Sequence, residues 1–126
     1  MPSFSRHLHV LVVEDDAAFR ELLAVRLRHL GIEVATAGSV PEAIETLEET
    51  HVDAVLSDYV LPGPSGLALL AYVRRALPLV PFVLMSASLD ADVRARAIIE
   101  GAEAVHEKRE LLPLLPQLFE RFPAAA

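Results

Sequence analysis

The sequence predicts a doubly wound α/β fold in which five parallel strands form one sheet with helices on both faces. Short apolar runs alternate with longer amphipathic segments, the alternation repeats five times, and turn residues separate the units. The 126 residues are 53% hydrophobic and 23% charged, which suits one packed domain. We therefore expect a single domain over residues 1–126, with a core over about 8–122 and short flexible termini.

The first two units each pair a strand with a helix. Residues 10–13 form a continuous β-branched run, which is typical of a strand buried on both faces. Helical apolar spacing follows over residues 19–30, and Gly31 predicts the helix end. Residues 32–36 alternate in polarity, as a half-exposed strand does. Ser39 and Glu42 form a capping box for the next helix.

The third and fourth units repeat the pattern with more strongly apolar strands. Residues 54–56 predict a buried strand, and a loop rich in proline and glycine at 62–66 precedes a helix over 67–77. Residues 82–85 predict another buried strand. Asp90 is the expected N-cap of a helix that runs to about residue 100, where Gly101 ends it.

The fifth unit contains the weakest strand, over residues 104–106, and a helix that runs to about residue 122 with Pro113 in its first turn. The three strongly apolar strands should be central, and the more polar second and fifth strands should be edges. This distribution indicates the flavodoxin-like strand order 2-1-3-4-5. A functional site is then expected at the carboxyl ends of the central strands.

Charge and hydropathy exclude several classes of function. The net charge of −7 and the lack of a Lys/Arg run argue against direct binding of DNA or RNA. No apolar stretch approaches the roughly 20 residues of a membrane span. The first nine residues lack the pattern of a signal peptide, and cysteine is absent, so we expect a cytoplasmic protein without membrane contact.

Five polar residues follow or end strands that the pattern brings to one sheet edge. Glu14 and Asp15 follow the first strand, Asp58 ends the third, Ser86 ends the fourth, and Lys108 follows the fifth. Clustered carboxylates repel one another unless a cation is present, and Mg²⁺ prefers such oxygen ligands. One carboxylate can then attack phosphorus, while an ammonium and a hydroxyl stabilise the transferring group.

These residues belong to an ordered set that resembles the signature of response regulator receiver domains. The set consists of Val12–Asp16, Asp58–Pro62 with Gly66, Met85–Ala87, Gly101–Ala102 and Lys108, and it spans nearly the whole chain. The resemblance implies two-component signalling, in which a sensor histidine kinase or histidine phosphotransfer protein donates a phosphoryl group and the domain responds by changing its surface. It also implies that the domain catalyses only its own phosphorylation and dephosphorylation and is not an enzyme acting on other substrates.

The resemblance also assigns roles to individual residues. Asp58 is the implied phosphoacceptor, and Mg²⁺ is held by Asp15 directly, by Glu14 through water, by Asp58 and by the backbone carbonyl of Val60. Ser86 is implied to donate to the phosphoryl oxygens and to move toward them on activation. Lys108 is implied to pair with the phosphoryl group. The implied output surface is the fourth helix, fifth strand and fifth helix.

Two positions depart from the family pattern, and two others bear on the lifetime of the phosphoryl group. Val105 stands where an aromatic switch residue is usual, and Arg109 stands where proline follows the lysine, so we expect a trans peptide bond and a reshaped loop. Val60 and Ser88 carry no carboxylate or amide that would orient an attacking water. We therefore expect slow self-dephosphorylation.

Alternative interpretations are kept beside this one. The chain is alternatively a receiver-like binding module that acts without phosphorylation, or a metal-dependent phosphohydrolase, although an Asp-x-Asp pair is lacking at Asp58. Asp16 is interpreted as a helix cap rather than a ligand. Arginines 74, 75, 94 and 96 are interpreted as solvated or partner-binding side chains. Apolar residues of the last helix (Leu111, Leu112, Leu115, Phe119) suit core packing, with a homodimer as the alternative; the downstream partner is not predictable.

Overall fold

The computed structural model describes residues 7–120 and residue 122, so the predicted flexible termini lie largely outside the described residues. The strands are β1 (His9–Val13), β2 (Glu33–Ala37), β3 (Ala54–Asp58), β4 (Phe82–Ser86) and β5 (Ala104–Glu107). The helices are α1 (Ala17–His29), α2 (Val40–Glu49), α3 (Gly66–Ala76), α4 (Ala91–Ile99) and α5 (Lys108–Glu120). Among these described helices, none has the length and apolar character needed to cross a bilayer.

One parallel sheet has the order β2-β1-β3-β4-β5, which confirms the predicted topology. Every residue of β3 and β4 is buried, whereas the edge strands β2 and β5 keep partly exposed residues. The polarity of each strand therefore predicted its place, because a central strand in a doubly wound sheet is covered on both faces and an edge strand is not.

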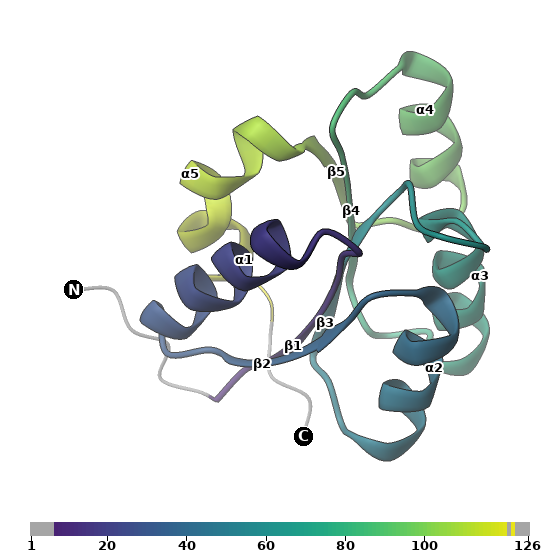
Figure 1. Ribbon diagram of the computed structural model, residues 1–126. Coiled ribbons are helices and arrows are strands. Elements are labelled where there is room, and N and C mark those ends of the chain that lie inside the picture. Colours follow the sequence, from purple (N-terminus) through teal and green to yellow (C-terminus); the bar gives the residue numbers. More distant parts are fainter. Residues whose placement is uncertain (1–6, 121, 123–126) are drawn as a thin grey trace.

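The helices form two layers around the sheet. In Figure 1, α1 and α5 lie on one side of the sheet and α2, α3 and α4 lie on the other. Side chains alternate along each strand, so Val10 and Val12 join the core beneath α1 and α5, while Leu11 and Val13 join the opposite core. This alternation divides the apolar residues into two cores that share the sheet.

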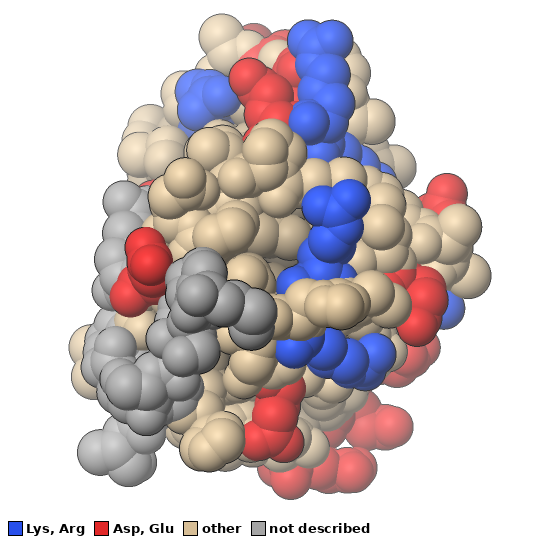
Figure 2. Space-filling view, turned by 90° about the vertical axis from the view of Figure 1, so that its left-hand side faces the viewer, with Lys and Arg blue, Asp and Glu red and all other residues tan. Residues whose placement is uncertain are grey.

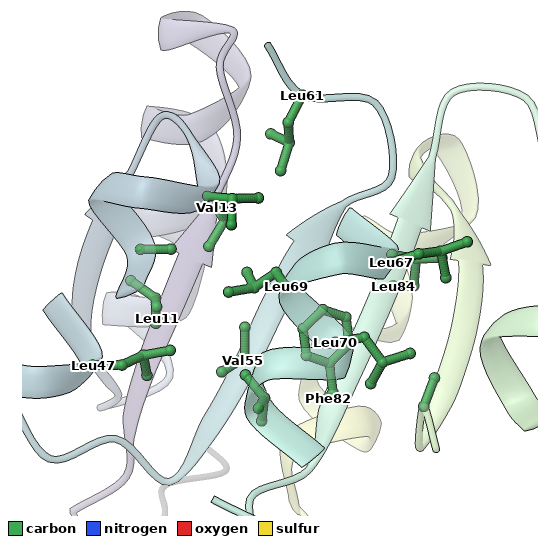
Figure 3. Close-up of a cluster of buried hydrophobic side chains, with 14 of the residues drawn as sticks. Leu11, Val13, Leu47, Val55, Leu61, Leu67, Leu69, Leu70, Phe82 and Leu84 are labelled. Atoms are coloured by element: carbon green, nitrogen blue, oxygen red, sulfur yellow. The ribbon is translucent and has the colours of Figure 1, made fainter. Parts of the chain in front are cut away.

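The larger core lies between the sheet and the three helices α2, α3 and α4. Figure 3 shows the α3 residues Leu69 and Leu70 directed toward Val55 of β3 and Phe82 of β4. All four side chains are fully buried. Burial of this apolar surface holds α3 against the strands whose carboxyl ends carry Asp58 and Ser86.

Short polar side chains begin the helices at the predicted places. Asp16 accepts hydrogen bonds from the backbone N–H groups of Ala18 and Phe19, at 2.9 and 3.2 Å. Ser39 and Asp90 cap α2 and α4. These contacts confirm the predicted caps and satisfy donors that the first helical turn leaves without partners in the helix.

The start of α5 differs from the prediction. The helix begins at Lys108, directly after β5, so Pro113 is its sixth residue and does not lie in the first turn. No residue separates β5 from α5, and the described residues contain no cis peptide bond, as expected for Arg109. The helix tolerates Pro113, which lacks the N–H that would reach the carbonyl of Arg109, because packing of its apolar face outweighs local propensity.

The apolar residues of α5 were predicted to pack in the core, with a homodimer as the alternative. Leu111, Leu115 and Phe119 are fully buried, and Leu112 packs against the same core. Leu111, Leu115 and Phe119 therefore belong to the core, as the simpler interpretation predicted, and the partly buried Leu112 packs against it.

Arg74 corrects the prediction that the helical arginines are solvated or bind partners. Its guanidinium donates to the carbonyls of Pro78 and Val80 in the loop between α3 and β4. A Cβ added to Gly101 would lie 2.7 Å from the Arg74 side chain, so the glycine makes room for the arginine. Burial lowers the pKa of the Arg74 guanidinium. The residue has a structural role that its position on a helix did not reveal.

Truncation of a side chain in the larger core should lower the stability of the protein. Leu70→Ala removes a fully buried side chain and is expected to lower the free energy of unfolding by about 2–5 kcal/mol. Leu79→Ala is the matched control, because Leu79 is 93% exposed, and it should change stability by less than about 0.5 kcal/mol. Urea denaturation followed by circular dichroism measures both, and equal effects would contradict the described core.

Candidate functional site

The predicted site residues meet at the carboxyl ends of β1, β3, β4 and β5. A cavity of about 480 Å³ at this edge is lined by Glu14, Asp15, Asp16, Asp58, Tyr59, Val60, Ser86, Ala87, Ser88 and Lys108. All the predicted residues are among them. The parallel sheet explains the convergence, because strands that run in the same direction deliver their following residues to the same edge.

Asp58 lies at the floor of the cavity and is only 4% exposed. One carboxylate oxygen, Oδ1, accepts the backbone N–H of Val60 at 3.2 Å, and the other, Oδ2, accepts the Lys108 ammonium at 2.8 Å. The neighbouring Ser57 hydroxyl donates to the Asp58 carbonyl at 3.0 Å. Both oxygens of the carboxylate are thus oriented before any ligand binds.

Lys108 forms a second ion pair inside the site. Its Nζ lies 2.7 Å from Oε1 of Glu14, which is fully buried, and it also lies 5.1 Å from the centre of the Phe19 ring. The other Glu14 oxygen, Oε2, accepts the backbone N–H of Asp16 at 3.0 Å. A single cation therefore bridges two buried carboxylates that belong to different strand ends.

Burial and neighbouring charges shift the pKa values of Glu14 and Lys108 in opposite directions. Burial raises the pKa of Glu14, and although the Lys108 ammonium and the Asp16 N–H lower it, the pKa stays above the ordinary value, with the charge of Asp58 adding to the rise. Burial alone would lower the pKa of Lys108, but the carboxylates of Asp58 and Glu14 outweigh it and raise that pKa. The raised pKa of Lys108 favours its charged form, and the site holds three carboxyl groups beside this one ammonium.

Three carboxylates at this edge suit a hard divalent cation. Glu14, Asp15 and Asp58 each offer an oxygen, and these oxygens lie within 4.8 Å of one another. Asp15 is exposed and can receive a cation from solvent. Within the described part of the chain, no other group of three such side chains meets this distance. The donor set is entirely oxygen, which fits Mg²⁺.

Two further polar side chains line the cavity, one carboxylate and one hydroxyl, and each forms hydrogen bonds outside the ion-pair group of Lys108. Asp16 lines the cavity but caps α1, as predicted. Ser86 is buried, and its hydroxyl donates to the backbone carbonyl of Ser88 at 2.9 Å. The structure thus brings Ser86 to the site with its donor already engaged within the loop after β4.

Further residues that the sequence did not single out support the site. Arg20 donates to the backbone carbonyl of Glu14 at 2.8 Å and so holds the end of β1. Gly66 begins α3, and a Cβ added there would lie 2.2 Å from the carbonyl oxygen of Asp58. The spacing of Arg20, one helical turn after the Asp16 cap, was the only sequence signal for its role. Gly66 carried a signal only as part of the resemblance.

Comparison with known proteins fits this geometry. The family model described as "response regulator receiver domain" matches residues 10–118. The chain belongs to this family. The match contains all the candidate site residues and most of both cores.

The relatives of this receiver domain are much longer proteins. The DNA-binding transcriptional regulator NtrC of Escherichia coli K12 is 36% identical over 93 residues, which are 74% of this chain and 20% of NtrC. The sensor histidine kinase RcsC of the same strain is 31% identical over 108 residues, which are 86% of this chain and 11% of RcsC. The chain therefore spans about a fifth or less of these two relatives.

A solved receiver domain matches nearly end to end. The non-phosphorylated HemR receiver domain from Leptospira biflexa is similar with a TM-score of 0.83 and 26% identity, and the match covers 94% of this chain and 99% of that one. Together with the family model, this similarity identifies the chain as a receiver domain of the two-component response regulator type.

The contact between Gly66 and Asp58 generates a prediction. In Gly66→Ala the added methyl group must displace the end of β3, so the free energy of unfolding should fall by about 1–3 kcal/mol. The control is Gly38→Ala, whose Cβ would meet its nearest neighbour, Arg20, at an ordinary 3.5 Å. Urea denaturation compares the two variants, and a Gly66→Ala protein as stable as the control would contradict the described close approach.

Proposed function

We propose that Asp58 accepts a phosphoryl group from a phosphohistidine on a sensor histidine kinase or phosphotransfer protein, in a reaction that requires Mg²⁺. The observation that carries the proposal is the buried Asp58 carboxylate, held by Lys108 beside Glu14 and Asp15 in an open cavity. Membership of the receiver family supports it.

The transfer requires one bond to form and one to break. A carboxylate oxygen of Asp58 attacks phosphorus, the P–N bond to the donor imidazole breaks, and the imidazole nitrogen leaves with the bonding pair. Bound Mg²⁺, held by Glu14, Asp15, Asp58 and the Val60 carbonyl, would supply positive charge beside the phosphoryl oxygens. No separate base is needed, because a carboxylate nucleophile has no proton to lose as it attacks.

Lys108 and Ser86 stabilise the product in this proposal. The Lys108 ammonium lies 2.8 Å from Oδ2 of Asp58 and can pair with a phosphoryl group bound there. The Ser86 hydroxyl can donate to the same group once it leaves the Ser88 carbonyl. This exchange of acceptors connects phosphorylation to the loop after β4.

The output is a change of surface rather than turnover of another substrate. We propose that the loop after β4 changes the face formed by α4, β5 and α5, and that a protein partner in the cytoplasm reads this face. Direct binding of nucleic acid is not part of the proposal. On the side that carries α1 and α5, Figure 2 shows the basic side chains in a narrow line among acidic and uncharged ones, not in a broad patch.

A receiver-like module that binds without phosphorylation is the second candidate. The observation that favours it is Val105, which is 2% exposed and has no long side chain that could turn toward the site. The intact arrangement of Asp58 and Lys108 favours phosphorylation instead.

The phosphoacceptor is tested by intact mass after incubation with acetyl phosphate and Mg²⁺. We expect one phosphoryl adduct in the unmodified protein, and none in Asp58→Asn or after EDTA treatment, because both the nucleophile and the metal charge are needed. Ser57→Ala is the matched control for a change beside Asp58, and it should still be phosphorylated. A folded protein that takes no adduct would favour the unphosphorylated binding module.

The side chain at position 60 is expected to set the lifetime of the phosphoryl group. Val60 is 65% exposed and lies on the cavity wall, but it offers nothing that orients water. Val60→Asn adds an amide that can, and should speed loss of the phosphoryl group by about tenfold, which corresponds to about 1.4 kcal/mol of barrier. Val60→Leu should leave the lifetime unchanged. Equal decay of the adduct in both variants, followed by intact mass, would refute this role.

A further inference from the structure

Two hydrogen bonds tie the segment after β4 to the edge strand β5. The backbone N–H of Leu89 donates to Oε2 of Glu107 at 3.4 Å. Farther along, the guanidinium of Arg94 in α4 donates to the backbone carbonyl of Val105 at 3.2 Å. Arg94 is exposed, as the prediction of a solvated side chain expects, and this contact adds a hydrogen bond to β5. The loop and the first turns of α4 are thus attached to β5 through hydrogen bonds.

Glu107 is itself held in place. Its second oxygen, Oε1, accepts from Arg109 Nε and pairs with Arg109 Nη2, both at 2.9 Å. The Glu107 side chain is only 21% exposed. Arg109 stands where the family usually has proline, so in this chain the residue after the lysine fixes the carboxylate that receives the Leu89 N–H.

Glu107 is close to Ser86 through both the sheet and the loop. Ser86 and Glu107 are partners in the register of β4 and β5. The Ser86 hydroxyl donates to the carbonyl of Ser88, and Ser88 directly precedes Leu89. In the proposed function the Ser86 hydroxyl leaves the Ser88 carbonyl to reach a phosphoryl group, and the bond from Leu89 to Glu107 holds the same short loop from its other end.

We propose that Glu107 is a positioning residue that holds the loop of residues 87–89 in its resting place and thereby opposes phosphorylation of Asp58. The inference rests on the proposed function. Val105 is too short to couple the strand to Ser86 by a change of rotamer. The Glu107 carboxylate, held by Arg109, instead connects β5 to the loop after Ser86. Glu107 lies opposite Ser86 in the register of β4 and β5.

The first test compares rates of phosphorylation by acetyl phosphate and Mg²⁺, followed by intact mass. Glu107→Ala removes the acceptor for Leu89 and should raise the rate about twofold to tenfold, the range that loss of one hydrogen bond gives. Glu107→Gln keeps one of the two oxygen acceptors and removes the charge, so its rate should lie between those of the unmodified protein and Glu107→Ala. Glu110→Gln, on the exposed side of α5, controls for loss of a negative charge near Lys108.

The second test follows hydrogen exchange at the Leu89 amide by NMR. Its protection should fall in Glu107→Ala, fall less in Glu107→Gln, and fall in the unmodified protein when Asp58 is phosphorylated. A purely electrostatic role of Glu107 would instead give equal rates in Glu107→Ala and Glu107→Gln and no change at Leu89. Either of those results would overturn the proposal.

The two proposals fail in different ways. If the unmodified protein takes no phosphoryl group, the proposed function fails, whatever Leu89 does. If it is phosphorylated on Asp58 while Glu107→Ala has the rate of the unmodified protein and the Leu89 amide stays protected, the function holds and the role of Glu107 is wrong. Urea denaturation of each variant separates these results from a loss of folding.

Discussion

The ammonium of Lys108 between Glu14 and Asp58 is the interaction on which the site depends. Two carboxylates that are almost completely buried would repel one another and lose hydration if no cation lay between them. Lys108 offsets only part of this cost, because it brings one positive charge to a group that also includes Asp15. Three carboxyl groups beside one ammonium make the cavity a favourable place for a divalent cation.

The parallel sheet holds these charged residues close together. Each site residue follows or ends a strand, and the strands are buried between two apolar cores, so the backbone that carries the charges cannot relax away from them. The approach of Gly66 to the Asp58 carbonyl adds a second constraint, because α3 begins against the end of β3. The strands beneath the site are packed on both faces, whereas the loop after β4 is held by single hydrogen bonds. The loop can therefore change its conformation more easily than the strands can.

The departures from the family pattern occur on β5 and at the start of α5. Val105 is buried, and Arg109 pairs with Glu107 instead of introducing the usual proline. These changes leave the contact between Lys108 and Asp58 intact at 2.8 Å. In the proposed function, phosphoryl transfer and the transmission of its effect depend on different residues, and these departures lie among the residues proposed for transmission.

The sequence by itself determined the strand order, the helix caps and the cavity residues, because burial of central strands, short polar caps and strand ends all leave local patterns. It placed Pro113 wrongly, since tertiary packing of α5 overrode the local preference of proline. Only the tertiary structure decided that Lys108 bridges Glu14 and Asp58, that Arg74 clamps a loop and that Glu107 receives the Leu89 N–H. Those contacts join residues that are distant in sequence or depend on side-chain direction, which no local pattern encodes.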